Sequence, residues 1–475
     1  MQLYSFVRAA SSNLQMLIKI ATNDFCVPQF SHFQTIIREL YDFCAPNSEG
    51  HNASYIPQLA AVDPSKWAIS VCTIDGQKFN IGDVDALFTM QSTSKPLTYA
   101  LAITEHGPDK VHDYVGYEPS GRKFNLVILN DNNKPHNPLI NSGAIAVTAL
   151  MKNGSCMPER FMYINKELSR MAGGVNLGFN NPVYLSERSS ADRNFSLAYY
   201  MREHKCFPPG TDLHETLDLY FQICSIETDS KAMATIAATM ANGGVNPITG
   251  ERILSGPAVR DTLSVMHSCG MYDYSGQFAF KVGLPAKSGV SGAIMLVVPN
   301  LMGIAIYSPR LDEQGNSVRG IQFCQELVKR FVFHNYDSLL HSSAKLDPRK
   351  HLHEDRVQSV VRLLFAAKNN DLNELRRCLI ANVDFNTTDY DDRTGLHVAA
   401  SAGAFDAVRF FIEVAHVDPN PLDRWHIKKG EISPSVEDKS LPKFNSFDAD
   451  TVRSPNKLRD FVKKEKKEDP ETAMN

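Results

Sequence analysis

The stretch "FTMQSTSKPLTYALAI", residues 88–103, has a group of polar residues immediately before a mostly apolar segment. It holds Ser92, then Lys95 three residues on, then Pro96. Because proline costs little only in the first helical turn, a helix here must begin close to Ser92. Ser92 could simply cap that helix. It could also be a nucleophile whose proton is taken by a neutral, desolvated Lys95.

The spacing alone does not decide between these alternatives. Ser-x-x-Lys also occurs at four other serines, Ser120, Ser342, Ser440 and Ser454. The serine β-lactamase and penicillin-binding superfamily pairs Ser-x-x-Lys with a later Lys-Thr-Gly on a sheet strand. A related triplet, "KSG", occurs here at residues 287–289, just ahead of an apolar run. This pairing favours Ser92 as the nucleophile.

The segments around Ser92 predict a mixed α/β (α+β) fold. Two β-rich runs flank Asp75-Gly76, which is a strong hairpin signal. Residues 110–265 are mostly helix-like, and strands return at 291–299 and 301–309 before a helix at 317–333. We therefore expect an antiparallel sheet that is assembled from both ends of this domain.

The mixed α/β part forms a catalytic domain that we expect to cover residues 51–345, and three further parts flank it. The first is a short helical segment over 1–50, which ends with a helix at 30–44. Within 355–425, Ala366 aligns with Ala399 in two ankyrin-like units, and a third is degenerate. Residues 426–475, with charges of both signs, predict a disordered tail.

Composition excludes several classes of function. A net charge of -4 over 475 residues argues against nucleic acid as a partner. No apolar run is long enough to span a membrane. Nine scattered cysteines without a CxxC pair indicate a reduced compartment, and the "HLH" at 351–353 is interpreted as surface rather than metal site. We expect no metal and no cofactor.

Long blocks of the sequence resemble the glutaminases of the animal kidney/liver type. They include "YIPQLAAVDPSKW" (55–67), "QSTSKPLTYA" (91–100), "KPHNPLINSGAI" (134–145) and "HSCGMYDYSGQFAFKVGLPAKSGVSG" (267–292). The resemblance implies a β-lactamase/transpeptidase-like catalytic domain followed by an all-α ankyrin module. It also implies hydrolysis of L-glutamine to L-glutamate and ammonia through an acyl-serine.

Site roles carried over from the family fall on matching positions of this chain. Ser92 is the expected nucleophile, Lys95 its base and Tyr272 a proton relay, with the backbone N–H groups of Ser92 and Val290 as the oxyanion hole. Glu187 is expected to take the substrate ammonium. The remaining substrate-binding positions are Tyr55, Gln91, Asn141, Asn194 and Tyr220, with Tyr272 and Val290 also in contact with substrate.

Each of these residues also has an ordinary structural alternative. Asn141 could cap the apolar helix that follows it, and Asn194 could be a turn residue. Glu187 could pair with Arg188 or Arg193 on a solvated face. The tyrosines at 55, 220 and 272 could belong to the core.

The resemblance further implies activation by inorganic phosphate and a homotetramer or higher assembly. The loop at 121–135 is expected to gate entry at a subunit contact, with the helix at 195–205 as partner surface. Arg122 and Ile128 differ from other members, so loop-directed inhibitors are expected to bind differently. The acid-free residues 1–23 fit a mitochondrial presequence or an ordinary helix equally, so the mitochondrial matrix is expected and the cytoplasm is the alternative.

Two competing functions stay open at this stage. A β-lactam-type hydrolase shares the Ser-x-x-Lys chemistry, but no secretory signal or matching substrate pocket supports it. A non-catalytic ankyrin scaffold with an inert amidase-like domain is the other. The presence of Ser92, Lys95, Tyr272 and Glu187 argues against that scaffold.

Overall fold

The computed structural model describes residues 19, 25–120, 129–337, 345–350, 352–380, 383–419, 421 and 424. The chain divides near residue 336 into two compact units, each of which is considered by itself. The predicted presequence apart from Lys19, the charged tail and the loop positions Arg122 and Ile128 lie outside the described residues.

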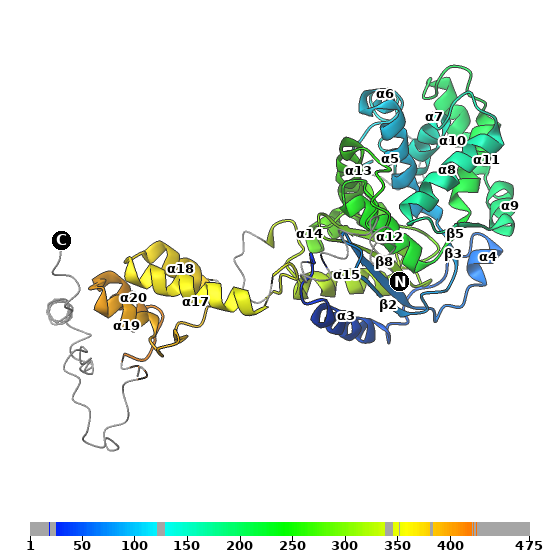
Figure 1. The fold of residues 1–475 in the computed structure, drawn as a ribbon. Coiled ribbons are helices and arrows are strands. Elements are labelled where there is room, and N and C mark those ends of the chain that lie inside the picture. The colour runs from blue at the N-terminus through cyan, green and yellow to red at the C-terminus, as the bar shows by residue number, and fades with distance from the viewer. Residues whose placement is uncertain are drawn as a thin grey trace, which may run out of the picture. The chain divides into compact units, whose positions relative to one another are not determined.

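A five-stranded antiparallel sheet forms the centre of the larger unit (Figure 1). Its strands are β1 (Ala68–Thr73), β2 (Lys78–Gly82), β6 (Ala286–Ser288), β7 (Ala293–Val298) and β8 (Met302–Tyr307), in the order β2-β1-β8-β7-β6. The predicted hairpin at Asp75-Gly76 is confirmed, since β1 pairs with β2, and the two later strands, β7 and β8, also pair with each other. The pairing of β1 with β8 confirms that the two ends of the domain meet in one sheet.

Helices cover both faces of this sheet, which explains why β1, β7 and β8 are buried along their whole length. Helix α12 (Ser230–Ala241) packs on β1, β7 and β8. A Cβ added to Gly303 of β8 would lie 2.1 Å from the Ala238 nitrogen, so glycine permits this close approach. On the other face, α15 (Val318–Arg330) approaches Ile294 of β7, and α3 (Phe30–Cys44) packs beside it.

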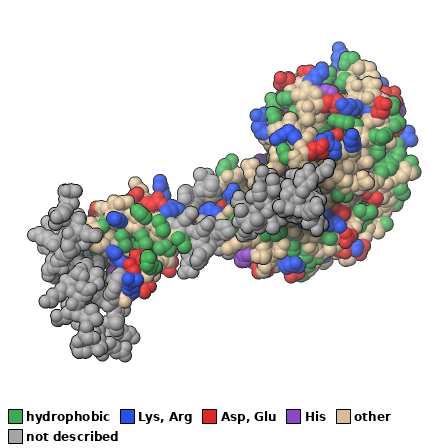
Figure 2. Space-filling model, in the orientation of Figure 1, with side chains coloured by type: hydrophobic (Ala, Val, Ile, Leu, Met, Phe, Trp, Pro, Cys, Tyr) green, Lys and Arg blue, Asp and Glu red, His purple; other side chains and the backbone are tan. Residues whose placement is uncertain are grey.

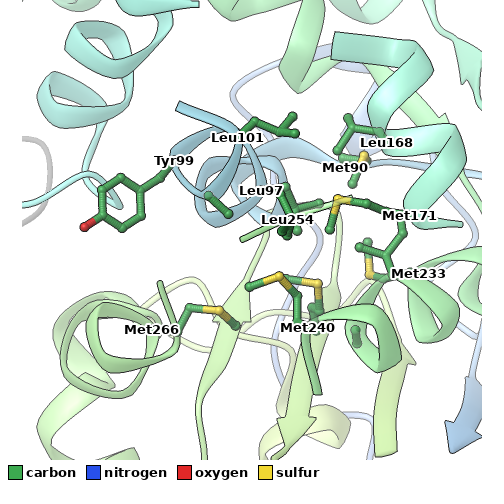
Figure 3. Close-up of a cluster of buried hydrophobic side chains, with 14 of the residues drawn as sticks. Met90, Leu97, Tyr99, Leu101, Leu168, Met171, Met233, Met240, Leu254 and Met266 are labelled. Carbon is green, nitrogen blue, oxygen red and sulfur yellow. The ribbon is translucent and has the colours of Figure 1, made fainter. Parts of the chain in front are cut away.

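The helical part of the larger unit surrounds α5 (Lys95–His106), which is buried from Lys95 to Ile103. Figure 3 shows methionines and leucines from several elements meeting beside it. The other helices are α4 (Pro57–Ala60), α6 (Pro108–His112), α7 (Asn141–Leu150), α8 (Met157–Met171), α9 (Asn181–Ser189), α10 (Asp192–Glu203), α11 (Leu213–Cys224), α13 (Gly256–Cys269) and α14 (Ser275–Lys281).

A second, small sheet was not predicted from the sequence. It joins β3 (Phe88–Thr89), β5 (Ile226–Thr228) and β4 (Gly178–Phe179) in the order β3-β5-β4. Strands this short carry no readable alternation of polar and apolar residues. Their pairing depends on contacts that are distant along the chain.

The smaller unit contains two helix pairs. They are α17 (Leu352–Lys368) with α18 (Leu372–Ile380), and α19 (Gly395–Ser401) with α20 (Phe405–Glu413). Their aligned positions, Ala366 and Ala399, lie in one buried cluster, which confirms that the sequence repeat is structural. Thr394 and His397 form a capping box at the start of α19.

The visible surface carries charged side chains of both signs, spread over each unit (Figure 2). All nine cysteines are free thiols, and seven of them are buried. Within the described residues, no helix is long and apolar enough to cross a membrane. No group of three or more potential metal ligands occurs in that part of the chain either.

Candidate active site

Ser92 lies where strand β3 turns into helix α5. A short 3₁₀ turn, Gln91–Ser94, connects the two, and α5 then begins at Lys95. Gln91 has a φ of 48°, a left-handed conformation that non-glycine residues adopt mainly where the surroundings enforce it. The helix-cap interpretation of Ser92 is wrong, because the N-cap residue is Ser94 and no side chain caps this end. The hydroxyl of Ser92 is therefore not used in capping.

Lys95 faces Ser92 from within the protein. Its Nζ lies 3.0 Å from the Ser92 Oγ and 2.6 Å from the Asn141 Oδ1, and only 3% of the residue is exposed. Burial lowers the pKa of Lys95 to about 8, although Cys224 and Glu187 act in the opposite direction. A neutral amine that donates to Asn141 can direct its lone pair at the serine hydroxyl. The geometry thus suits a general base.

A group of amide and phenol side chains adjoins Lys95. Asn141 is the first residue of α7, whose N-cap is Ile140, so Asn141 does not cap that helix. Its Nδ2 donates to the Asn194 Oδ1 at 3.3 Å, which brings the start of α10 to the site. The ring of Tyr220, on α11, lies 5.9 Å from the Lys95 Nζ. Neutral donors therefore gather on this side, as a carboxylate ligand would require.

Glu187 of α9 marks the acidic side of the site. Its Oε1 accepts hydrogen bonds from the Tyr55 hydroxyl at 2.6 Å and the Gln91 Nε2 at 3.0 Å. Arg188 instead pairs with Asp218 at 2.8 Å, which removes the surface-pair alternative for that arginine. Burial raises the pKa of Glu187, and the two hydrogen bonds oppose that effect. Such a partly buried acid can receive an ammonium group.

Tyr272 begins the short 3₁₀ turn Tyr272–Tyr274, just before α14. It has a φ of 53°, and its hydroxyl interacts with Ser92 while burial raises the pKa of Tyr272 above its ordinary value. Val290 lies two residues after the end of β6 and packs against the small cluster of Ile56, Leu59 and Val183. The role of Val290 in the oxyanion hole stays a prediction.

Sequence reasoning assigned no role to Lys287, which the structure places beside Tyr272. Its Nζ lies 4.3 Å from the centre of the Tyr272 ring and donates to the Ser288 carbonyl at 2.8 Å. Burial, reinforced by the charge of Lys95, lowers the pKa of Lys287 well below that of a free lysine. The "KSG" triplet contains Lys287 and could have indicated it, but the triplet was used only to favour Ser92 as the nucleophile.

Models of two protein families match the chain. The glutaminase model matches residues 50–336, and a model of ankyrin repeats in many copies matches residues 363–412. The chain is 50% identical over 422 residues to the putative glutaminase 3 of Caenorhabditis elegans, and the match covers 89% of this chain and 72% of that one. It is 49% identical over 420 residues to the mitochondrial liver isoform of glutaminase from Rattus norvegicus, covering 88% and 70%.

Solved structures agree with these matches. The structure of ybaS, a probable glutaminase, superposes with a TM-score of 0.60 at 38% identity, and the match covers 62% of this chain and 95% of that one. A structure of Mglu in its glutamate form gives a TM-score of 0.59 at 38% identity, covering 62% and 66%. Sequence, fold and site geometry lead to the same conclusion: the chain belongs to the glutaminase family.

Proposed function

We propose that this glutaminase-family hydrolase converts L-glutamine and water to L-glutamate and ammonia through an acyl-enzyme on Ser92. The observation that carries this mechanism is the 3.0 Å contact between the Ser92 Oγ and the buried Lys95 Nζ. A lysine held near neutrality can take a serine proton without a histidine.

The reaction then follows in two stages. Neutral Lys95 takes the Ser92 proton, and the serine oxygen bonds to the amide carbon of the substrate. The N–H groups of Ser92 and Val290 stabilise the oxyanion of the tetrahedral intermediate. Tyr272 relays a proton to the departing nitrogen, the C–N bond breaks, and ammonia leaves. Water then attacks the acyl-serine ester, which releases L-glutamate and restores the hydroxyl.

Recognition of glutamine uses the two sides of the site. Glu187 binds the substrate ammonium. Hydrogen bonds from Tyr55 and Gln91 hold the Glu187 carboxylate in place. Asn141, Asn194 and Tyr220 bind the substrate carboxylate with neutral donors. A substrate that lacks either group would leave buried polar atoms unpaired, so it should be rejected strongly.

Regulation, assembly and location are proposed on family grounds. Inorganic phosphate activates the enzyme, and the chain forms a homotetramer or a higher assembly. The enzyme acts in the mitochondrial matrix, a proposal supported by the rat relative that is named mitochondrial. The ankyrin repeats bind a protein partner, as such stacked helices commonly do.

Ammonia release from L-glutamine tests the proposal, measured with and without phosphate for the wild type and for Ser92→Ala. The wild type should be active, and Ser92→Ala should lose activity by at least about 10³-fold. Ser454→Ala, which alters another Ser-x-x-Lys match, is the control and should behave as the wild type. An inactive wild type at high phosphate would favour the scaffold function. Activity that survives Ser92→Ala would remove Ser92 as the nucleophile.

A further inference from the structure

Two segments that follow α6 in the chain pair with each other. Residues 115–118 and 134–137, together called the neck, are joined by backbone hydrogen bonds from Gly116 to Pro135 at 2.8 Å and from Glu118 to His136 at 3.0 Å. The Asn137 Nδ2 also donates to the Glu118 carbonyl at 3.0 Å. The neck therefore holds together the two ends of the segment that lies between its halves.

The neck continues directly into the active site. Asn137 is 1% exposed, and its Oδ1 accepts from the backbone nitrogens of Leu139 at 3.0 Å and Ile140 at 3.2 Å. The next residue is Asn141, which contacts Lys95. A Cβ on Gly143 would lie 1.9 Å from the Asn137 carbonyl oxygen, so α7 and the neck are in close contact. A shift of the neck must therefore move Asn141.

A buried hydrogen bond connects the neck to the catalytic helix. Tyr99 lies one turn after Lys95 on α5 and is 1% exposed. Its hydroxyl lies 3.0 Å from the His112 Nε2. Figure 3 shows its ring pointing away from the methionine cluster, with the oxygen at the far end. The hydroxyl therefore contributes a directed polar contact in addition to core packing.

His112 in turn holds both halves of the neck. Its Nδ1 lies 2.9 Å from the Val115 carbonyl oxygen, and its own carbonyl accepts from the Lys134 Nζ at 2.7 Å. Because a carbonyl can only accept, Nδ1 must carry a hydrogen. In the neutral ring Nε2 is then the acceptor, and Tyr99 is the donor. The His112 ring thus connects Tyr99 of α5 to Val115 in the first half of the neck. The backbone carbonyl of His112 connects to Lys134 in the second half.

We propose that Tyr99 and His112 are positioning residues that couple the neck to α5 and so set Asn141 against Lys95. This inference rests on the proposed function, because it assigns the pair a part in glutamine binding and in orienting the base. Neither side chain touches the substrate. Their effect on the reaction passes through residues 137–141.

The test uses the full chain with Tyr99→Phe, His112→Asn and the double variant. Phe keeps the buried ring, and Asn keeps a donor near the Nδ1 position but has no group at Nε2. Tyr41→Phe is the matched control. Tyr41 lies on α3, and its hydroxyl donates to the Trp67 carbonyl at 3.3 Å, so this hydrogen bond involves no residue of the neck. The readouts are KM and kcat for L-glutamine, the pH profile, the affinity for L-glutamate by calorimetry and the melting temperature.

Each single variant should raise the KM for L-glutamine and the Kd for L-glutamate about tenfold, the size expected from one lost hydrogen bond. The acidic limb of its pH profile should also shift, because Asn141 contacts the base. The double variant should lose no more than a single one, since both remove the same bond. Tyr41→Phe should change neither constant, even if its melting temperature falls as much as that of Tyr99→Phe.

Unchanged KM, Kd and pH profile in Tyr99→Phe would overturn the inference, as would effects that multiply in the double variant. Changes that Tyr41→Phe reproduces would equally reduce the pair to a structural role. A wild type that releases no ammonia and binds no L-glutamate would overturn the proposed function itself. The positioning of Asn141 would then lose its basis as well. Failure of the inference is thus distinct, since it leaves the wild type fully active.

Discussion

The catalytic unit and the repeat unit are held together by different kinds of contact. In the catalytic unit, β1 pairs with β8, Lys95 contacts Asn141, and Tyr55 contacts Glu187, all across long stretches of chain. In the repeat unit, contacts lie within one helix end, as between Thr394 and His397, or join the two helix pairs, as where the Ala407 nitrogen donates to the Asn370 Oδ1. The site chemistry therefore depends on the whole catalytic unit, whereas each repeat depends mainly on its neighbour.

The two units also treat charge differently. The catalytic unit buries the amines of Lys95 and Lys287, and burial lowers the pKa of each. In the repeat unit, Arg409 and Glu413 form an exposed ion pair at 2.7 Å. Exposed pairs contribute little to stability, whereas a buried amine is costly and persists where function requires it. This difference separates effects on activity from effects on stability.

The largest effect is expected from Lys95→Met in the catalytic unit. Removal of the base should lower kcat/KM for glutamine by about 10²- to 10⁴-fold. Methionine fills a similar volume without a buried charge, so the free energy of unfolding should not decrease. Steady-state kinetics and thermal unfolding measure the two effects.

Lys66→Met is the control for this variant, since Lys66 forms an exposed ion pair with Asp83 at 2.8 Å. Its activity should equal that of the wild type. A Lys95→Met enzyme that retains wild-type kcat/KM would show that a buried amine is not needed for the reaction.

An intermediate effect is expected from Leu375→Ala in the repeat unit. Leu375 is fully buried in the cluster shared by both helix pairs. Its truncation should destabilise that unit by about 2–5 kcal/mol while glutamine hydrolysis continues. Calorimetric unfolding, read alongside ammonia release, measures this. Ile380→Ala, at a position that is 69% exposed, should have little effect, and equal losses from both variants would contradict the assigned core.

The smallest effect is expected from Thr394→Ala. The Thr394 side chain accepts from the His397 nitrogen and caps α19. Loss of this cap should cost about 1 kcal/mol in the repeat unit, with activity unchanged. Chemical denaturation followed by a probe in the repeat unit measures this change. A fall in kcat/KM would indicate that the two units are coupled.

Local patterns in the sequence predicted the first hairpin, the two later strands, the helix at 30–44 and the repeat. Asp75-Gly76 marked the first turn, where Gly76 has a φ of 89°. The small sheet β3-β5-β4 was missed because its pairs depend on contacts far apart in the sequence. Local propensity carries no information on such pairing.

The site was predictable only through the family resemblance. Spacing placed Lys95 beside Ser92, but nothing local indicates that Glu187 would accept from Tyr55 and Gln91. Nor does sequence reveal the left-handed backbone of Gln91 and Tyr272, which the packed surroundings impose. No role was predicted for Lys287, because the "KSG" triplet was used only to support Ser92 as the nucleophile. The position of the Lys287 amine beside Tyr272 depends on the fold.

The pH dependence of kcat/KM for L-glutamine, at fixed high phosphate, tests the central claim most directly. Protonated Lys95 cannot accept the serine proton, and burial lowers the pKa of Lys95 to about 8. Below that pH the neutral fraction falls about tenfold per pH unit, so activity should rise from pH 6 and level off above pH ~8. A flat profile from pH ~6 to ~9 would contradict a neutral Lys95 as the base.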